Sequence, residues 1–377
     1  MTDAVSENLF GETIAKVGPP ILAGLDALEQ AFRQLHPPAF PVLQVRLAPV
    51  AAALAAAERS LGAVLTPASL TAFRQDLAEI LRLTRRALSA FVEPGPPEAG
   101  IARVFAAMHD FARAQAHLYP LHPALPAVSE HFLEPFRRGR SGPSKRGEGR
   151  PAQGGLFRSG AVDERGGFDL YVPEHYDGSE AWPLVVALHG GSGNGADFLW
   201  SWLREARSRD FILLSPTSLG RTWSLHAPAI DGERLARQIE RIVVDWRVDQ
   251  ERVLLTGLSD GATMSFLVGA AAGSPFTHLA PIAGVLHPMN CANGNLERLR
   301  GRPVFLVHGA LDWMFPVALA REAARILERS GVALVYRELE DLSHTYPREQ
   351  NAKIIEWFDP RRAQSALAAD PPVSVPR

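Results

Sequence analysis

The chain has 377 residues, 46% of them hydrophobic and 21% charged, which is the composition of a soluble globular protein with about two domains. Its formal net charge of −2 excludes a general electrostatic attraction to nucleic acid or anionic membranes, and its single cysteine, Cys291, excludes an intramolecular disulfide. The first 16 residues carry three acids and no apolar core, and no uninterrupted apolar run reaches the ~18 residues that span a bilayer. We therefore expect a cytoplasmic protein without a membrane span, unless a secretory signal has already been removed.

Residues 1–136 are expected to form an all-helical domain. Apolar side chains recur there at spacings of three and four, which places them on one face of successive helices. The first such stripe consists of Ile21, Leu25, Leu28, Phe32 and Leu35. Proline-rich breaks separate the helices, and Thr66 followed by Pro67 predicts the capped start of one of them. The pattern predicts four or five antiparallel helices, which we expect either to cap a substrate site or to mediate a homo-oligomer.

The histidines of this helical region raise the question of a metal site. They are His36, His109, His117, His122 and His131, with Asp110 beside the second. They show no paired i, i+4 arrangement with a third ligand, so we interpret them as helix-surface residues and expect no bound metal.

The composition changes between residues 137 and 155, where six basic side chains and one acid are interspersed with glycine, proline and serine. This composition predicts a linker. No aromatic residues interleave the charges, as they would in a segment that binds single-stranded nucleic acid, so we expect no nucleic-acid partner. The Pro/Ala-rich residues 361–377 predict a loosely ordered tail.

Residues 156–360 alternate between short apolar strands and amphipathic helices. The expected strands are 168–172, 184–188, 211–214, 253–256, 279–285, 304–307 and 334–339. The expected helices are 196–207, 231–246 with Asp231 as its cap, 262–272, 317–330 and 349–358. Such alternation predicts an α/β fold, a mostly parallel sheet with helices on both faces, and ligands in such sheets bind at the carboxyl ends of the strands.

The stretch Gly257-Leu258-Ser259-Asp260-Gly261 matches the nucleophile-elbow pattern G-x-S-x-G between a strand and a helix. A Cβ at either glycine would collide with the neighbouring strand or helix in so tight a turn. The turn exposes the serine hydroxyl and imposes strained backbone angles on it. Because glycine and serine are common, the pentapeptide alone is also compatible with an ordinary turn.

A serine nucleophile needs a base, most often a histidine held by a carboxylate. Asp312 follows the strand 304–307 and His344 follows the strand 334–339, so both fall at the carboxyl edge where Ser259 is expected. Asp341 is the alternative acid, but a loop of three residues would have difficulty orienting its own histidine. The alternative bases are His189, which we expect to brace its loop, His308, which lies in or just after a strand, and His287.

Ester or amide hydrolysis also needs hydrogen-bond donors for the tetrahedral oxyanion. The N–H of Asp260, at the start of the helix after the turn, is one candidate. The loop that follows Leu188 supplies the other, at Gly191 with Gly190 beside it. Glycines at these positions let the backbone approach a substrate closely.

With these features in order, the sequence resembles the serine esterases of the α/β-hydrolase superfamily. More narrowly it resembles the carboxylesterase/phospholipase-type and polyhydroxybutyrate-depolymerase-like esterases. The matching stretches are 170–173, 188–191, 221–224, 257–261, 308–312 and 343–344. The resemblance covers residues 156–360 and implies an α/β-hydrolase fold to which the N-terminal helices are an addition.

We therefore expect a serine hydrolase that cleaves small-molecule carboxylic esters through an acyl-enzyme, without a metal or organic cofactor. Trp223 and Trp313 are candidates for walls of the substrate pocket, with core packing as the alternative for each. Two other functions remain open. The same triad would also suit a peptide or a thioester. The helical region could instead be the functional part, as a docking or oligomerisation module with incidental hydrolysis.

Overall fold

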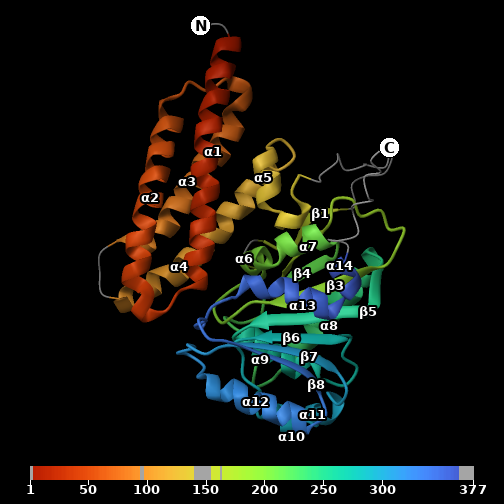
Figure 1. The fold of residues 1–377 in the computed structure, drawn as a ribbon. Coiled ribbons are helices and arrows are strands. Elements are labelled where there is room, and N and C mark those ends of the chain that lie inside the picture. Colours follow the sequence, from red (N-terminus) through yellow and green to blue (C-terminus); the bar gives the residue numbers. More distant parts are fainter. Residues whose placement is uncertain (1–2, 94–96, 140–153, 162–163, 365–377) are drawn as a thin grey trace, which may run out of the picture. The chain divides into compact units, whose positions relative to one another are not determined.

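The computed structural model describes residues 3–93, 97–139, 154–161 and 164–364. The chain divides into two compact units, Met1–Phe132 and Leu133–Arg377, each with its own internal packing (Figure 1). Most of the expected linker, residues 140–153, and most of the expected tail, residues 365–377, lie outside the described residues.

The first unit is helical, as the spacing of its apolar residues predicts. Its helices are α1 (Asp3–Arg33), α2 (Phe40–Ala63), α3 (Thr71–Val92), α4 (Pro97–Leu118) and α5 (Pro126–His131), with 3-10 turns at Pro37–Ala39, Ala68–Leu70 and Tyr119–Leu121. The four long helices lie side by side, with α2 against α1 and α3, and α3 against α4 (Figure 1). Their inward faces meet in an apolar core that includes aromatic contacts such as Phe32 with Phe91.

The first helix of this unit extends further than its predicted apolar stripe, and one predicted cap is wrong. Helix α1 begins at Asp3 and continues through Pro19 and Pro20, because Phe10 and Val17 extend the buried stripe toward the N-terminus. The predicted cap at Thr66 is wrong. The backbone is extended at Pro67 (ψ 142°), a 3-10 turn follows, and α3 starts only at Thr71 with no side chain capping it.

Helix α2 is unusually apolar. Among the described residues, Pro37–Ala63 is the one helical stretch long and apolar enough to cross a bilayer, with a mean hydropathy of 1.6 and 22% of its most apolar window buried. Its inward side chains pack within the first unit; they are Phe40, Leu43, Leu47, Leu54, Ala57 and Leu61. Because the core helix of a bundle passes the same test of length and composition, the absence of a membrane span stays a prediction.

The second unit is built on a sheet of eight strands in the order β1-β2-β4-β3-β5-β6-β7-β8. The strands are β1 (Gly155–Ser159), β2 (Phe168–Val172), β3 (Trp182–Leu188), β4 (Ile212–Pro216), β5 (Val248–Leu258), β6 (His278–Ile282), β7 (Pro303–Gly309) and β8 (Ala333–Leu339). Strands β3 to β8 pair in parallel, whereas β1 pairs antiparallel with β2, and β2 antiparallel with β4. The expected mostly parallel sheet is confirmed, with β1 as an unpredicted edge strand.

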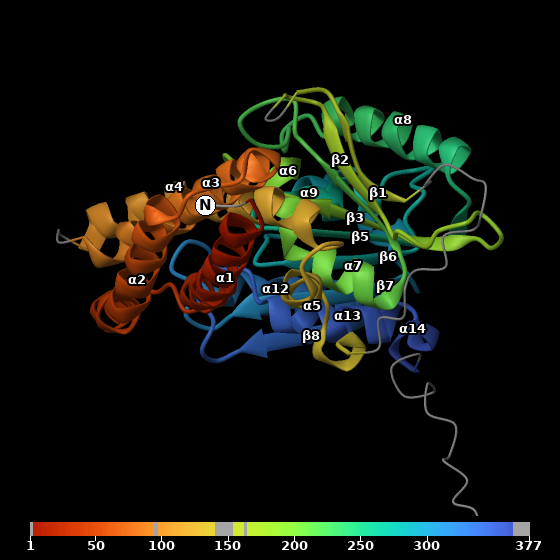
Figure 2. The ribbon, with the colours of Figure 1, turned by 90° about the horizontal axis from the view of Figure 1, so that it is seen from above.

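Helices cover both faces of this sheet (Figure 2). They are α6 (Gly195–Phe198), α7 (Leu203–Arg209), α8 (Ala229–Asp245), α9 (Asp260–Gly269), α10 (Met289–Ala292), α11 (Asn295–Arg298), α12 (Val317–Arg329), α13 (Asn351–Phe358) and α14 (Pro360–Gln364). Apolar residues of α8, α9 and α12 share one core with Val304 and Leu306 of β7. Phe305 points to the other face and contacts Trp357 of α13.

The turn from β5 to α9 fixes the position of Ser259, whose backbone adopts φ 57° and ψ −118°. A Cβ on Gly261 would lie 2.3 Å from the carbonyl oxygen of Leu188, and one on Gly257 would lie 2.5 Å from the carbonyl carbon of Gly261. Both contacts are with backbone, which has little freedom to move aside. The two glycines are therefore required by the close packing of β5, β3 and α9.

Gly261→Ala should consequently destabilise the second unit, by about 1–3 kcal/mol or more in the free energy of unfolding, because β3 or α9 must shift to admit the methyl group. Gly62→Ala is the matched control, since nothing lies within 4 Å of a Cβ built there. Chemical denaturation of both variants gives the comparison. Equal stability of the two would contradict the packing described here.

Candidate active site

The nucleophile candidate Ser259 lies at the carboxyl end of β5, between the strand and the first turn of α9. Its N–H donates to the carbonyl oxygen of Ile282 at the end of β6 (3.0 Å), which ties the turn to the neighbouring strand. The residue is 9% exposed, so its hydroxyl lies in a largely water-excluded position.

The structure brings Ser259, His344 and Asp312 together. His344 Nε2 lies 2.9 Å from Ser259 Oγ, and His344 Nδ1 lies 2.8 Å from Asp312 Oδ2. Asp312 follows β7 and His344 follows β8, so the carboxyl ends of three strands in one half of the sheet supply the three groups. If Nδ1–H donates to the carboxylate, Nε2 is left to accept the proton of the serine hydroxyl.

The carboxylate of Asp312 is itself held by its own loop. Its Oδ1 accepts hydrogen bonds from the backbone N–H groups of Met314 (3.0 Å) and Phe315 (2.7 Å). The ring of Phe315 then packs edge-on against His344, with centroids 5.0 Å apart. The loop after β7 therefore orients both the acid and the face of the histidine ring.

His344 and Asp312, rather than the alternative acid and bases, form the hydrogen-bonded chain to Ser259. Asp341 is exposed, whereas His344 Nδ1 is bonded to Asp312. His308 is fully buried beneath the site, with Nε2 2.8 Å from the carbonyl oxygen of Phe315 and 3.3 Å from Asp312 Oδ2. His287 lies against His226, with ring centroids 5.6 Å apart. Ser259 Oγ thus meets the ring of His344.

His189 has the bracing position that we expected from its place after β3. Its Nδ1 lies 2.7 Å from the carbonyl oxygen of Gly190, and its Nε2 accepts the N–H of Ser218 (3.1 Å). Burial lowers the pKa of His189 to about 4, because the charged ring would lose its hydration, so the ring is neutral near pH 7. A neutral ring is what these two hydrogen bonds require, one nitrogen donating and the other accepting.

The oxyanion candidates surround Ser259 from two loops. A Cβ built on Gly190 would lie 3.6 Å from Ser259 Cβ, so this backbone passes directly beside the nucleophile. Asp260 is the first residue of α9, and the first N–H groups of a helix have no acceptor within the helix. Gly191 is exposed and lies against the carboxylate of Asp260. The arrangement could present donors to an oxygen held next to Ser259.

The two tryptophans proposed as pocket walls differ in their surroundings. Trp223 is 3% exposed within the core of the sheet, and its indole Nε1–H donates to the carbonyl oxygen of His189 (2.8 Å). Trp313, next to Asp312, is 45% exposed. The surroundings of Trp223 correspond to the core-packing alternative, whereas Trp313 presents a large apolar surface to solvent.

One carboxylate near the site has a function that sequence reasoning missed. Asp231, expected to cap a helix, lies inside the first turn of α8 and accepts the backbone N–H groups of Leu219 (3.0 Å) and Ser224 (2.7 Å). It therefore fixes the loop after β4 rather than its own helix. The sequence around this acid shows only the start of an amphipathic helix, and that pattern carries no signal of a loop contact.

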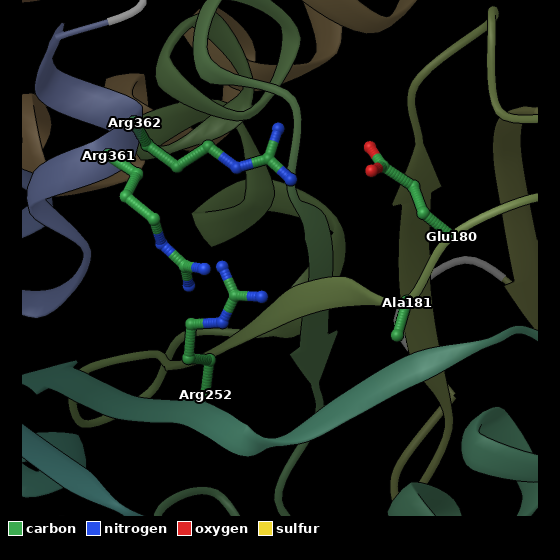
Figure 3. A pocket seen from close by; sticks show the side chains of 5 residues that line it. All are labelled: Glu180, Ala181, Arg252, Arg361 and Arg362. Carbon is green, nitrogen blue, oxygen red and sulfur yellow. The ribbon is translucent and has the colours of Figure 1, made fainter.

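A hollow of about 250 Å³ lies away from Ser259, at the amino ends of β3 and β5. Figure 3 shows the guanidinium groups of Arg252, Arg361 and Arg362 facing this hollow, with Glu180 across from them. Asp359 accepts hydrogen bonds from Arg252 (2.6 Å) and Arg361 (3.0 Å). These paired charges fasten the start of α14 to β5.

Comparison with known proteins finds similarity to esterases over part of the chain. Residues 233–359 match the phospholipase/carboxylesterase family, a match that includes Ser259, Asp312 and His344. The chain is also 26% identical, over 156 residues, to a probable feruloyl esterase C from Aspergillus terreus. That alignment covers 39% of this chain and 55% of the relative, so the chain spans about half the length of the relative that it matches.

Solved structures with similar folds include an esterase and a peptidase. The acetyl xylan esterase from Aspergillus awamori is 19% identical with a TM-score of 0.44, over 54% of this chain and 99% of that one. The acylaminoacyl peptidase from Pyrococcus horikoshii is 14% identical with a TM-score of 0.44, over 56% of this chain and 42% of that one. Over residues 233–359 the chain is thus similar to the phospholipase/carboxylesterase family, and its mostly parallel sheet with helices on both faces is the arrangement expected of an α/β-hydrolase fold.

Proposed function

We propose that this protein is a serine hydrolase of carboxylic esters, with Ser259 as nucleophile, His344 as general base and Asp312 as the residue that orients it. The observation that supports this most is the unbroken chain of hydrogen bonds from Ser259 Oγ through His344 to Asp312, with lengths of 2.9 and 2.8 Å. The match to the phospholipase/carboxylesterase family supports an ester as the substrate.

In the proposed reaction, His344 Nε2 takes the hydroxyl proton as Ser259 Oγ attacks the ester carbonyl carbon. The N–H groups of Asp260 and Gly191, with Gly190 beside them, stabilise the negative charge on the carbonyl oxygen. The C–O bond then breaks and His344 returns its proton to the leaving alcohol, which leaves Ser259 acylated. Water attacks this acyl-enzyme with His344 again as base, which releases the acid and restores the serine.

The bond that is cleaved is the finer part of the proposal. The same three groups act on peptides and thioesters in other folds, so the triad alone does not select an ester. Rates on p-nitrophenyl esters, aryl esters, lysophospholipids, short polyester oligomers, an acyl thioester and a peptide anilide separate these alternatives. We expect an ester to be the best substrate, and a peptide anilide or thioester with the highest kcat/KM would reject the ester assignment.

For the first unit, Met1–Phe132, we propose a supporting role in substrate access or oligomerisation rather than a part in the chemistry. A compact helical unit that precedes the whole sheet could shape substrate access or join two copies of the chain. A role in substrate access would affect the preference for ester chain length, whereas a role in joining two copies would affect the native mass.

Ser259→Ala should leave the fold intact and lower kcat by a factor on the order of 10⁴–10⁶, as loss of the nucleophile does in serine proteases. Hydrolysis of p-nitrophenyl acetate measures the loss, and circular dichroism confirms the fold. A well-folded variant that kept more than a few per cent of the activity would remove Ser259 from the mechanism.

Asp312→Asn should lower kcat by a factor on the order of 10⁴. The amide of asparagine has the shape of the carboxylate, but its N–H group favours the tautomer of His344 that lacks a proton on Nδ1. Asp341→Asn is the matched control, since Asp341 is exposed and lies near the same histidine in the chain. We expect it to retain nearly all activity in the same assay. The reverse ranking would assign the acid to Asp341.

A truncated chain that begins at Leu133 tests the first unit. This start keeps the contacts of Glu134 N–H with Ser208 Oγ (2.8 Å) and of Arg137 with Asp210 (2.9 Å) inside the second unit. A role in substrate access predicts an altered ester chain-length profile at unchanged oligomeric state. A role in oligomerisation predicts a monomer with the same profile, and no change in either measurement would exclude both roles.

A further inference from the structure

The loop after β4 braces the loop that carries the oxyanion glycines. We call residues 218–224 the bracing loop and residues 189–192 the glycine loop. The bracing loop accepts one hydrogen bond, from Ser192 N–H to the carbonyl oxygen of Arg221 (2.9 Å). The bracing loop also donates three hydrogen bonds. Two go to His189: Ser218 N–H donates to its Nε2 (3.1 Å), and Trp223 Nε1–H donates to its carbonyl oxygen (2.8 Å). The third runs from Arg221 to Ser192 Oγ (3.4 Å). The path of the glycine loop is therefore set by residues about 30 positions later in the chain.

Thr222, in the middle of the bracing loop, also reaches the nucleophile turn. Its hydroxyl donates to Asp260 Oδ2 at 2.5 Å. The same oxygen would lie 2.7 Å from a Cβ built on Gly191, so the carboxylate rests against the backbone of the glycine loop. One side-chain contact therefore joins the bracing loop, the glycine loop and the start of α9.

We propose that Thr222 is a positioning residue for the oxyanion site. Through its bond to the Asp260 carboxylate, it sets the spacing between the Gly191 backbone and the Asp260 backbone, which carry the two proposed oxyanion donors. This inference rests on the proposed function, because an oxyanion forms only if Ser259 attacks a carbonyl group. It adds a residue that the triad and the glycine loop do not contain.

The expected consequence is confined to the transition state. Donors that are correctly spaced stabilise the oxyanion more than the ground-state carbonyl, so a change in their spacing lowers kcat. Without the Thr222 hydroxyl, the Asp260 carboxylate loses a short charge-assisted hydrogen bond and turns toward another donor. Because that carboxylate touches Gly191, the glycine loop moves with it. Substrate binding elsewhere is unaffected, so KM should change little.

The test compares Thr222→Val with Thr222→Ser in the full chain. The valine variant keeps the shape of threonine and removes its hydroxyl, so we expect kcat for p-nitrophenyl acetate to fall by about 10- to 100-fold, with KM within about twofold. The serine variant restores the donor and should recover most of kcat. Inactivation by a fluorophosphonate should slow in parallel in the valine variant, because the phosphonyl oxygen occupies the same site.

Thr277→Val is the matched control. The Thr277 hydroxyl, just before β6, donates to the carbonyl oxygen of Val253 and accepts its N–H, each at 3.1 Å, away from Ser259. The same chemical change there should leave kcat unchanged. Thr222→Ala removes the hydroxyl without placing a methyl group in its position. It must show the same loss of kcat as the valine variant.

Wild-type kcat in folded Thr222→Val, or equal losses in the valine and serine variants, would overturn the role of Thr222. These outcomes leave the proposed function standing, because they require an active wild-type enzyme. A wild-type protein that hydrolyses no ester and does not react with the fluorophosphonate would instead reject the proposed function, and the Thr222 inference with it.

Discussion

The candidate site depends on one tight turn, in which Ser259 adopts φ 57° and ψ −118° between β5 and α9. A non-glycine residue in such a conformation carries strain on the order of 1–3 kcal/mol, and the surrounding structure must hold it there. Here the restraint is packing. Gly261 lies against the backbone of Leu188 and His189, and the Ser259 N–H is bonded to Ile282 on β6. The neighbouring strands β3 and β6 thus fix the direction of the serine hydroxyl.

The order of the strands then determines which loops can reach that hydroxyl. Strands β7 and β8 lie beyond β6 on one side of β5, and their carboxyl ends supply Asp312 and His344. Strands β3 and β4 lie on the other side, and their loops supply the glycine loop and the bracing loop. The proton-transfer groups and the proposed oxyanion donors therefore approach Ser259 from opposite halves of the sheet. This separation lets a substrate carbonyl lie between them, as the proposed mechanism requires.

The strand pattern and the three groups at the strand ends were accessible from sequence for a common reason. Each of Ser259, Asp312 and His344 lies within five residues after a short apolar run, and parallel strands place such positions at one edge. Strand β1 was missed because it lies at the sheet edge, where Leu156 and Phe157 are 40% and 36% exposed and show no buried pattern. The contacts of the bracing loop were equally inaccessible. They join residues about 30 positions apart, as in Trp223 with His189, and no local periodicity reports them.

The central claim is that Ser259 forms a covalent intermediate with the acyl group. The most direct measurement is mass spectrometry of the protein after reaction with a fluorophosphonate, followed by proteolysis and mapping of the modified peptide. The account predicts one adduct per chain, located on Ser259. Treating the protein first with an excess of a slowly hydrolysed ester should prevent this adduct from forming. An adduct on another residue, or no adduct in a protein that hydrolyses esters, would contradict it.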